Sequence, residues 1–369
     1  MNKVAYKKNK KILLLGLNGR GGTLHYASSI SSNLSRFTEV SLLLPSYSDS
    51  SLISKDVNII RITAPPNTLK TIFFTFNIFQ HITAIKEMNK TNADVLDILD
   101  IHPWYVMYWP FLKAKKKIVT INDPELHSGE SGWLMTFILR KITRFLLGNA
   151  DEIIVLGSRQ KETVKRLGYK QPIIVSRIGQ YDFFTKKTKK KYLVEPNTLL
   201  FFGRIKEYKG LKYLLEALDI INDKNIKFKL IIAGEGDIAP YAEMIKRLGD
   251  KVEQYIGYIS DEKAAEYFQR ASFIVMPYTD ATQTGVVQVA YSFKKPVIAT
   301  NVGSLPEVVI DGNTGIIIMS KNVAALSKAI QSLLENQMKA KKFGSNGYRF
   351  MKQELNWNSI VKKLLKDIE

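Results

Sequence analysis

Short apolar runs of strand length recur along this chain, and segments of helical length separate most of them. The runs are rich in Ile, Val, Leu and Phe, as is typical of strands buried on both faces of a parallel sheet. In the first half they begin at residues 11, 39, 94, 117, 152 and 172, and the pattern restarts with runs beginning at 198, 228, 251, 272, 296 and 314. This alternation indicates an α/β protein with two doubly wound, Rossmann-like units.

A chain of 369 residues exceeds what one hydrophobic core usually spans, which also favours two domains. We place an N-terminal domain at residues 1–185 and a C-terminal domain at residues 198–352. Residues 186–197 are rich in lysine and contain a proline, so they are expected to form an exposed basic hinge. Residues 353–369 carry apolar side chains at helical spacing, which predicts a C-terminal helix that packs back on the N-terminal domain.

The formal net charge of +20 favours an anionic partner, which could be a phosphorylated substrate, an anionic membrane face or nucleic acid. No recognised RNA or DNA module interrupts the two-domain pattern, so no nucleic-acid partner is expected. The chain has no cysteine, which excludes disulfides and thiolate metal sites. The N-terminal apolar run reads as a first strand, and Asn77, Gln80 and His81 interrupt the longest apolar stretch, so a cytoplasmic protein without a spanning helix is expected.

Two cations surround a predicted turn in the stretch FFGRIKEYKG, residues 201–210. If a buried strand ends near Gly203, Arg204 and Lys209 lie on the loop at its carboxyl end, before the next helix. A guanidinium, an ammonium and a helix N-terminus together suit a diphosphate. The alternative is that both are ordinary basic residues on a solvated loop.

Two further strand ends carry candidate ligand contacts. Gly234 and Gly236 form a Gly-x-Gly turn, which either lets backbone approach a ligand or is a plain tight turn. Another strand is followed by four small or polar residues at the start of a helix, an arrangement that also suits an anion. These four are Thr282, Gln283, Thr284 and Gly285.

The order of these motifs resembles the retaining GT-B glycosyltransferases of glycosyltransferase family 4 over essentially the whole chain. The matching stretches are GLNGRGG, FFGRI with YKGL, IIAGEG, and KKPVIATNVGSLPEVVIDGNTG. The resemblance implies two Rossmann-like domains facing each other across a cleft, with the acceptor bound by the first domain and the nucleotide sugar by the second. It further implies that Arg204 and Lys209 bind the donor diphosphate, and that Gly21 and Gly22 lie near the reacting sugar.

The chain departs from this family where two glutamates, eight positions apart, are usual. Ungapped counting places Ala281 and Val289 there, although Asp280 and Gln288 show the same spacing one position earlier. The TQTG sequence is similar to a variant of this region in polysaccharide-building members, so activity is still expected.

In the first domain, Asp123 and His127 follow a predicted strand and are expected to orient or deprotonate an acceptor hydroxyl. The family has a histidine where this chain has Asn122. His127 could also be an ordinary loop histidine, and His102 could simply help to end a turn. His25 and His81 fall within predicted helices and are expected to be structural.

Glu307 is a weaker donor-site candidate. Ser304 and Glu307 have the spacing of a helix capping box, and that role alone would explain the glutamate.

Aromatic and basic residues cluster within residues 67–88 and 104–117. These clusters suit peripheral attachment to an anionic inner leaflet and a lipid-linked acceptor. The alternative is that the aromatic side chains are core and the lysines form a solvated face.

The sequence thus predicts a metal-independent hexosyltransferase that moves a sugar from a nucleotide diphosphate sugar to a lipid-linked or growing surface glycan. No cofactor is expected, and no Asp-x-Asp motif occurs, so Arg, Lys and helix dipoles would neutralise the leaving diphosphate. Two alternatives remain open: a GT-B sugar-nucleotide epimerase and a non-catalytic subunit that binds nucleotide sugar or glycan.

Overall fold

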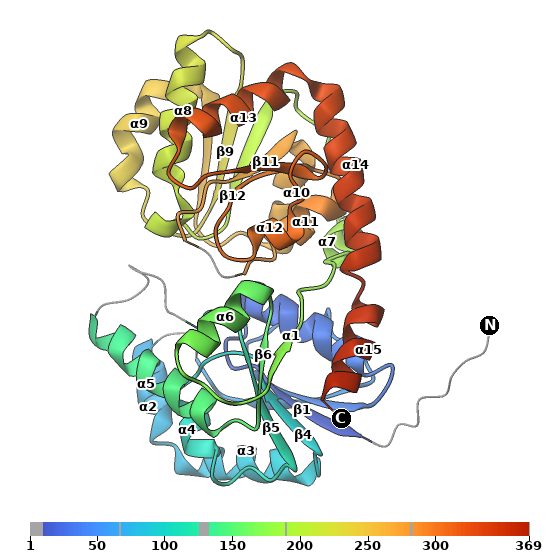
Figure 1. Ribbon diagram of the computed structural model, residues 1–369. Helices are drawn as coiled ribbons and strands as arrows, with labels where there is room; N and C mark the ends of the chain where they lie inside the picture. Colours follow the sequence, from blue (N-terminus) through green and yellow to red (C-terminus); the bar gives the residue numbers. More distant parts are fainter. Residues whose placement is uncertain (1–9, 66–67, 125–132, 189, 281–282, 369) are drawn as a thin grey trace, which may run out of the picture. The chain divides into compact units, whose positions relative to one another are not determined.

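The computed structural model describes residues 10–65, 68–124, 133–188, 190–280 and 283–368, and it divides into two compact units (Figure 1). Within the described residues, the first unit comprises the chain up to residue 178 together with residues 357–368. The second unit comprises residues 179–356. Each unit is built on one parallel sheet, as the sequence predicts.

The first unit has a seven-stranded sheet in the order β3-β2-β1-β4-β5-β6-β7. Its strands are β1 (Lys11–Leu15), β2 (Glu39–Pro45), β3 (Val57–Ile62), β4 (Val95–Ile98), β5 (Lys116–Ile121), β6 (Glu152–Val155) and β7 (Ile173–Val175). Its helices are α1 (Gly21–Leu34), α2 (Thr68–Thr75), α3 (Ile78–Lys90), α4 (Trp104–Tyr108), α5 (Trp133–Asn149), α6 (Ser158–Arg166) and α15 (Trp357–Asp367).

The second unit has a six-stranded sheet in the order β10-β9-β8-β11-β12-β13. Its strands are β8 (Thr198–Phe202), β9 (Lys229–Gly234), β10 (Val252–Ile256), β11 (Phe273–Met276), β12 (Val297–Thr300) and β13 (Gly315–Ile318). Its α-helices are α7 (Phe183–Lys187), α8 (Leu211–Asp223), α9 (Ala242–Leu248), α10 (Asp261–Arg270), α11 (Val286–Ser292), α12 (Leu305–Val308), α13 (Val323–Glu335) and α14 (Gln337–Glu354). Its single-turn 3₁₀ helices are η1 (Glu207–Lys209), η2 (Ala239–Tyr241) and η3 (Gly249–Lys251).

All twelve predicted strands are confirmed, and one further strand, β3, was not predicted. This strand lies at the edge of its sheet, and the exposed polar residues Asn58 and Arg61 interrupt its apolar residues, so it lacks the continuous apolar run of the central strands. Arg61 on β3 donates hydrogen bonds to the carbonyl oxygens of Pro45 (2.9 Å) and Ser48 (3.0 Å).

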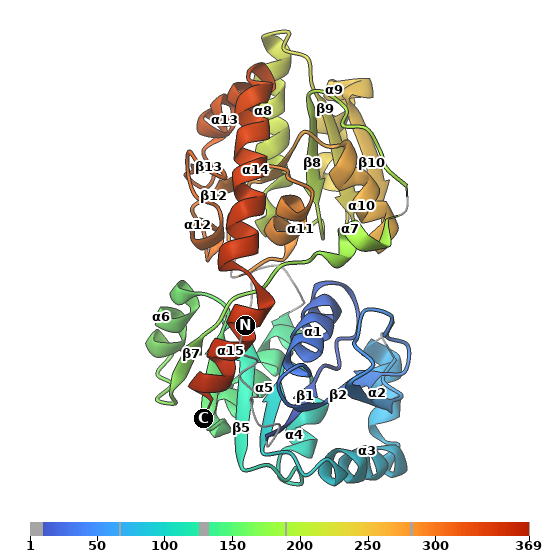
Figure 2. The same ribbon diagram turned by 90° about the vertical axis from the view of Figure 1, so that its right-hand side faces the viewer.

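One core cluster of the first unit lies between its sheet and the layer of α3, α4 and α5, where Met88, Trp104 and Leu146 are buried. On the other face α15 packs against α1 (Figure 2). The ring centres of Trp357 and Tyr26 lie 6.0 Å apart. The last helix of the chain therefore completes the first unit.

In the second unit α8 and α13 share one core cluster with the sheet. Helix α14 approaches α11 so closely that a Cβ on Gly347 would lie 2.4 Å from the Tyr291 ring. None of the helices in the described part of the chain has both the length and the apolarity that a bilayer-spanning segment needs.

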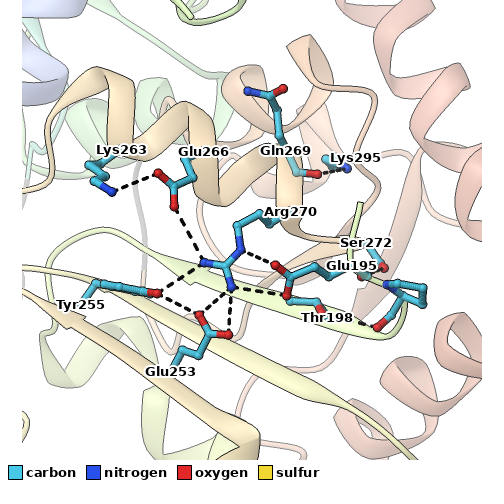
Figure 3. A network of polar contacts seen from close by, with 11 residues as sticks. Glu195, Thr198, Glu253, Tyr255, Lys263, Glu266, Gln269, Arg270, Ser272 and Lys295 are labelled. Atoms are coloured by element: carbon cyan, nitrogen blue, oxygen red, sulfur yellow. Dashed lines mark hydrogen bonds and ion pairs between the residues drawn. The ribbon is translucent and has the colours of Figure 1, made fainter. Parts of the chain in front are cut away.

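Residues 190–197, part of the predicted hinge, belong to the second unit and are hydrogen-bonded to its α10 (Figure 3). The Glu195 amide donates to the Arg270 carbonyl oxygen (2.8 Å), and the Tyr192 amide donates to the Gln269 side chain (3.1 Å). Arg270 also pairs with the carboxylates of Glu195 and Glu253, the latter at 2.6 Å. Leu193 and Val194 are exposed between these anchors, yet the two units meet along the chain at residues 178 and 179, before the predicted hinge.

Candidate active site

At the carboxyl edge of the second sheet, the loops after β8 and β9 contact each other through glycines that pack against backbone atoms. Gly203 follows β8 with a φ of 112°, and Gly234 ends β9. A Cβ on Gly234 would lie 1.9 Å from the Gly203 oxygen, and one on Gly236 would lie 2.3 Å from the Ile205 oxygen. Of the two readings of this Gly-x-Gly turn, the structure therefore supports a tight turn whose glycines are needed for contact between two loops of the chain itself.

Lys209 is placed by the turn that precedes α8. Gly210 adopts a φ of 73°, and a Cβ there would lie 1.9 Å from the Pro277 oxygen, so this loop meets the loop after β11. The Lys209 ammonium lies 3.9 Å from the centre of the Tyr278 ring. Lys209 is therefore held at the end of β11 by a cation–π contact, whereas Arg204 is exposed on the loop after β8.

Thr284 and Gly285 occupy the turn before α11. The Thr284 hydroxyl accepts a hydrogen bond from the Val286 amide at 3.2 Å. A Cβ on Gly285 would lie 2.5 Å from the Tyr181 ring, so this glycine makes room for an aromatic side chain of the same unit. Gln283 accepts from the Thr284 amide at 3.2 Å.

Tyr278 joins Lys209 to this turn, and the sequence analysis did not single it out. Burial raises the pKa of the Tyr278 hydroxyl, and the neighbouring Thr284 hydroxyl offsets part of that rise. The signal was present, because Tyr278 directly follows the strand run and the proline in the sequence IVMPY. Only the folded chain, however, brings its ring under Lys209.

The candidates around the missing glutamates lie in different surroundings. Gln288 and Val289 are buried in α11, whereas Asp280 is exposed. His127, Ala281 and Thr282 lie outside the described residues.

The predicted capping role of Ser304 at α12 is wrong. The Ser304 side chain makes no capping hydrogen bond, and its buried hydroxyl has no partner among the described residues. The turn is closed by backbone, since the Glu307 amide donates to the Ser304 carbonyl oxygen at 3.1 Å. The Ser304 hydroxyl therefore does not cap this helix, and the partly buried Glu307 stays a candidate donor contact.

In the first unit, Gly21 and Gly22 begin α1, and a Cβ on either would meet nothing within 4 Å. Gly21 has a φ of 54°. The chain before them is bound by Asp100 and Tyr105, two buried residues that the sequence analysis missed. The signal for Asp100 was its place just after a strand, where loop residues face the functional edge of a parallel sheet.

Asp123 lies in the loop after β5, and its neighbour Asn122 accepts a hydrogen bond from the buried Gln160 side chain at 2.6 Å through its carbonyl oxygen. Gln160, on α6, therefore fixes the start of the loop that carries Asp123.

The two buried histidines of the first unit have structural contacts. His102 Nδ1 accepts from the Trp104 amide at 3.2 Å, which supports its role in ending a turn, and burial lowers its pKa to about 4. His81 bonds the Tyr108 hydroxyl (2.7 Å) and the Phe74 carbonyl oxygen (3.1 Å). Within the described ranges, no group of three His, Asp or Glu side chains is arranged to hold a metal ion.

Residues 182–350, almost all of the second unit, match the family of glycosyl transferases group 1. An uncharacterized glycosyltransferase of Methanocaldococcus jannaschii is 33% identical over 277 residues, which cover 74% of this chain and 75% of that protein. The chain is a group 1 glycosyltransferase.

Solved structures of other proteins show the same GT-B fold. Sucrose-phosphate synthase from Thermosynechococcus elongatus has a TM-score of 0.76 to this glycosyltransferase at 21% identity, covering 98% of this chain and 99% of that one. The Anabaena protein HepE, solved in complex with UDP and glucose, has a TM-score of 0.70 at 14% identity, covering 98% and 99%.

Proposed function

We propose that this glycosyltransferase is a retaining, family 4 enzyme that moves a hexose from a nucleotide diphosphate sugar to a lipid-linked or growing surface glycan. The observation that carries the proposal is the position of Lys209, held over Tyr278 where the loops after β8 and β11 meet. In doubly wound sheets this carboxyl edge is where nucleotide ligands bind.

Lys209 and Arg204 are suited to the leaving group of this reaction. When the bond from the sugar carbon to the diphosphate oxygen breaks, negative charge grows on the diphosphate, and two cations can stabilise it more in the transition state than in the ground state. The first turn of α8 begins two residues after Lys209, at Leu211, and adds backbone N–H groups. This chemistry requires neither a metal ion nor a cofactor, and we propose that the enzyme uses none.

The other donor contacts are proposed from the turns already described. Gly203, Gly234 and Gly236 shape the two loops, while the Gln283–Gly285 turn and Glu307 would contact the nucleotide sugar. A neutral turn suits phosphate and sugar oxygens, because hydroxyl and amide groups donate hydrogen bonds without repelling the donor.

We assign the acceptor to the first unit. Asp123 would orient or deprotonate the acceptor hydroxyl, and the loop of Gly21 and Gly22 would lie beside the reacting sugar. The open space at both glycines is compatible with the close approach of a ligand.

We also propose that the first unit attaches to an anionic membrane on its cytoplasmic face. Half of the exposed large hydrophobic side chains of the described chain lie on or beside α2, α3, α4 and α5. They include Phe76 (77% exposed) and Phe79 (85%). Arg140, Lys141 and Arg144 are exposed on α5, so apolar and basic groups share one helical layer, as in proteins that bind anionic lipid.

The donor site is tested by substitution at Lys209 and Arg204. Lys209→Ala and Arg204→Ala should each lower kcat/KM. The decrease should correspond to a loss of ~2–5 kcal/mol of transition-state stabilisation, as for truncated charge pairs in desolvated sites. Lys212→Ala is the matched control, because Lys212 lies on the first turn of α8 and is 63% exposed in a loose pair with Glu216. Near-parental kcat/KM in both test variants, with the donor found by screening nucleotide sugars for thermal stabilisation, would overturn the diphosphate assignment.

Membrane attachment is tested by flotation with vesicles. Phe76→Ser with Phe79→Ser should weaken binding to anionic vesicles, and raised salt should weaken it further because exposed charges are screened. Leu193→Ser is the control, since Leu193 is 88% exposed on the second unit. Equal flotation of the parent with neutral and anionic vesicles contradicts the proposal.

A further inference from the structure

Asp100 is a buried carboxylate that gathers hydrogen bonds from the loop between β1 and α1. It lies two residues beyond β4 and is 7% exposed. One carboxylate oxygen accepts from the Asn18 amide at 2.6 Å, and the other accepts from the Leu17 amide at 3.3 Å. The Tyr105 hydroxyl donates to that second oxygen at 2.8 Å and itself accepts from the Leu17 amide at 2.9 Å.

These contacts fix both sides of the same loop. Asp100 and Tyr105 hold two successive amides, at Leu17 and Asn18, while the Thr23 hydroxyl is within hydrogen-bonding distance of the carbonyl oxygens of Asn18 (2.6 Å) and Arg20 (2.8 Å). The Arg20 guanidinium also lies 5.0 Å from the centre of the Tyr47 ring. The path of the chain from β1 into Gly21 and Gly22 is therefore determined by side chains.

Neighbouring Asp97 shows what a buried carboxylate does elsewhere on the same segment. It lies within β4, is 6% exposed, and accepts from the Thr120 amide (3.1 Å) and hydroxyl (2.9 Å) on β5. These hydrogen bonds join two neighbouring strands, β4 and β5, and not the loop between β1 and α1. Asp97 and Asp100 thus share burial and a raised pKa but differ in what they hold.

We propose that Asp100 and Tyr105 are positioning residues for glycosyl transfer: they hold the loop 17–22 in the conformation that receives the reacting sugar of the donor. This inference rests on the proposed function, because it takes that loop to border the sugar. Neither residue needs to touch a substrate, since each acts through the backbone of Leu17 and Asn18. A buried carboxylate suits this task because it accepts from three donors at once, which a neutral amide oxygen cannot do as well.

Two substitutions, one at each residue of the pair, test the role while nearly keeping the shape of the original side chain. Asp100→Asn replaces one acceptor oxygen by an NH₂ group, so the carboxamide can no longer serve Asn18, Leu17 and Tyr105 together. Tyr105→Phe removes the hydroxyl that bridges Asp100 and Leu17. Asp97→Asn is the matched control, a buried carboxylate three residues earlier in the chain.

Hydrogen exchange of the full chain gives the first readout. In Asp100→Asn and Tyr105→Phe, the amides of Leu17 and Asn18 should exchange faster, while in Asp97→Asn they should keep the parental rate. Unchanged exchange in both test variants overturns the inference. If Asp100→Asn does not fold, Tyr105→Phe alone decides.

Steady-state kinetics gives the second readout. Because misplacement of a positioning loop by about 1 Å costs up to ~100-fold in rate, kcat should fall by about 10- to 100-fold with little change in KM for the donor. Equal kinetic losses in Asp97→Asn and Asp100→Asn would mean that the effect is only structural, and would overturn the proposal. A parent enzyme that transfers no sugar contradicts the proposed function instead, and the exchange experiment still reports whether Asp100 and Tyr105 hold the loop.

Discussion

The carboxyl edges of the two sheets hold their loops by different means. In the second unit, backbone lies against backbone, as where Gly210 meets Pro277 and Gly234 meets Gly203. In the first unit, the loop after β1 is held by the side chains of Asp100 and Tyr105. The same type of sheet therefore supports loops fixed by the absence of side chains and loops fixed by particular side chains.

This difference predicts opposite sensitivities. A glycine contact against backbone tolerates no added methyl group, but pH does not change it. A buried carboxylate tolerates small changes of shape, but its charge depends on pH, and burial raises the pKa of Asp100 to about 6. The loops of the second unit should respond to steric changes, and those of the first unit to protonation and hydrogen bonding.

The largest effect expected on the stability of the fold is steric. Gly234→Ala would place a methyl group 1.9 Å from the Gly203 oxygen at a φ of 158°, so the second unit should lose about 3 kcal/mol of stability. Gly22→Ala is the control, since a Cβ there meets nothing within 4 Å. The loss is measured by denaturant unfolding in which hydrogen exchange monitors the second unit. Equal stability of the two variants would contradict the proposed difference between the loops of the two units.

A pH effect of roughly 1–3 kcal/mol on stability should belong to the sheet of the first unit, where buried Asp97 joins β4 to β5 beside the loop that Asp100 holds. Burial raises the pKa of Asp97 to about 7, above its ordinary value of 3.8, so the folded state binds a proton more tightly than the unfolded state between these values. The contribution of Asp97 to stability is therefore fully present below about pH 4 and is lost as pH rises to about 7. Urea unfolding at several pH values gives the free energy of unfolding of the parent and of Asp97→Asn. The difference between the two should decline from about pH 4 to about pH 7, and a difference that does not change with pH would contradict the prediction.

A smaller loss, of about 1–2 kcal/mol in kcat/KM, is expected from removing a ring in the second unit. Tyr278→Leu deletes the aromatic face that lies 3.9 Å from the Lys209 ammonium. Tyr278→Phe keeps that face and should retain most of the activity. If the two variants have the same kcat/KM, the ring does not position Lys209.

The smallest effect concerns the Thr284 hydroxyl, which accepts from the Val286 amide. Thr284→Val keeps the shape of the side chain and removes one hydrogen bond, so ~0.5–1.5 kcal/mol should be lost. Under the proposed donor site, turnover should fall more than stability. Parallel measurement of kcat and of the unfolding midpoint separates the two, and a loss of stability alone would remove Thr284 from the donor site.

The sequence was sufficient for the features that depend on local pattern. Twelve strands followed from apolar runs, whereas β3 was missed because an edge strand needs only one apolar face. The capping box at Ser304 had the right residues and spacing, but its helix is a single turn closed by backbone. The contacts of Lys209 with Tyr278 join residues 69 positions apart, and those of Asp100 with Asn18 join residues 82 apart, so local spacing could not reveal them.

The C-terminal helix α15 belongs to the first unit, although the whole second unit precedes it in the chain. Trp357 packs near Tyr26, and Asn358 accepts a hydrogen bond from Arg36 at 3.0 Å. If a genetic exchange replaced only the N-terminal half with that of a relative, α15 of this chain would have to pack against the α1 of another protein. Recombination between members of this family is therefore expected to succeed when both segments of the first unit move together, or when the continuous second unit is inserted as a block.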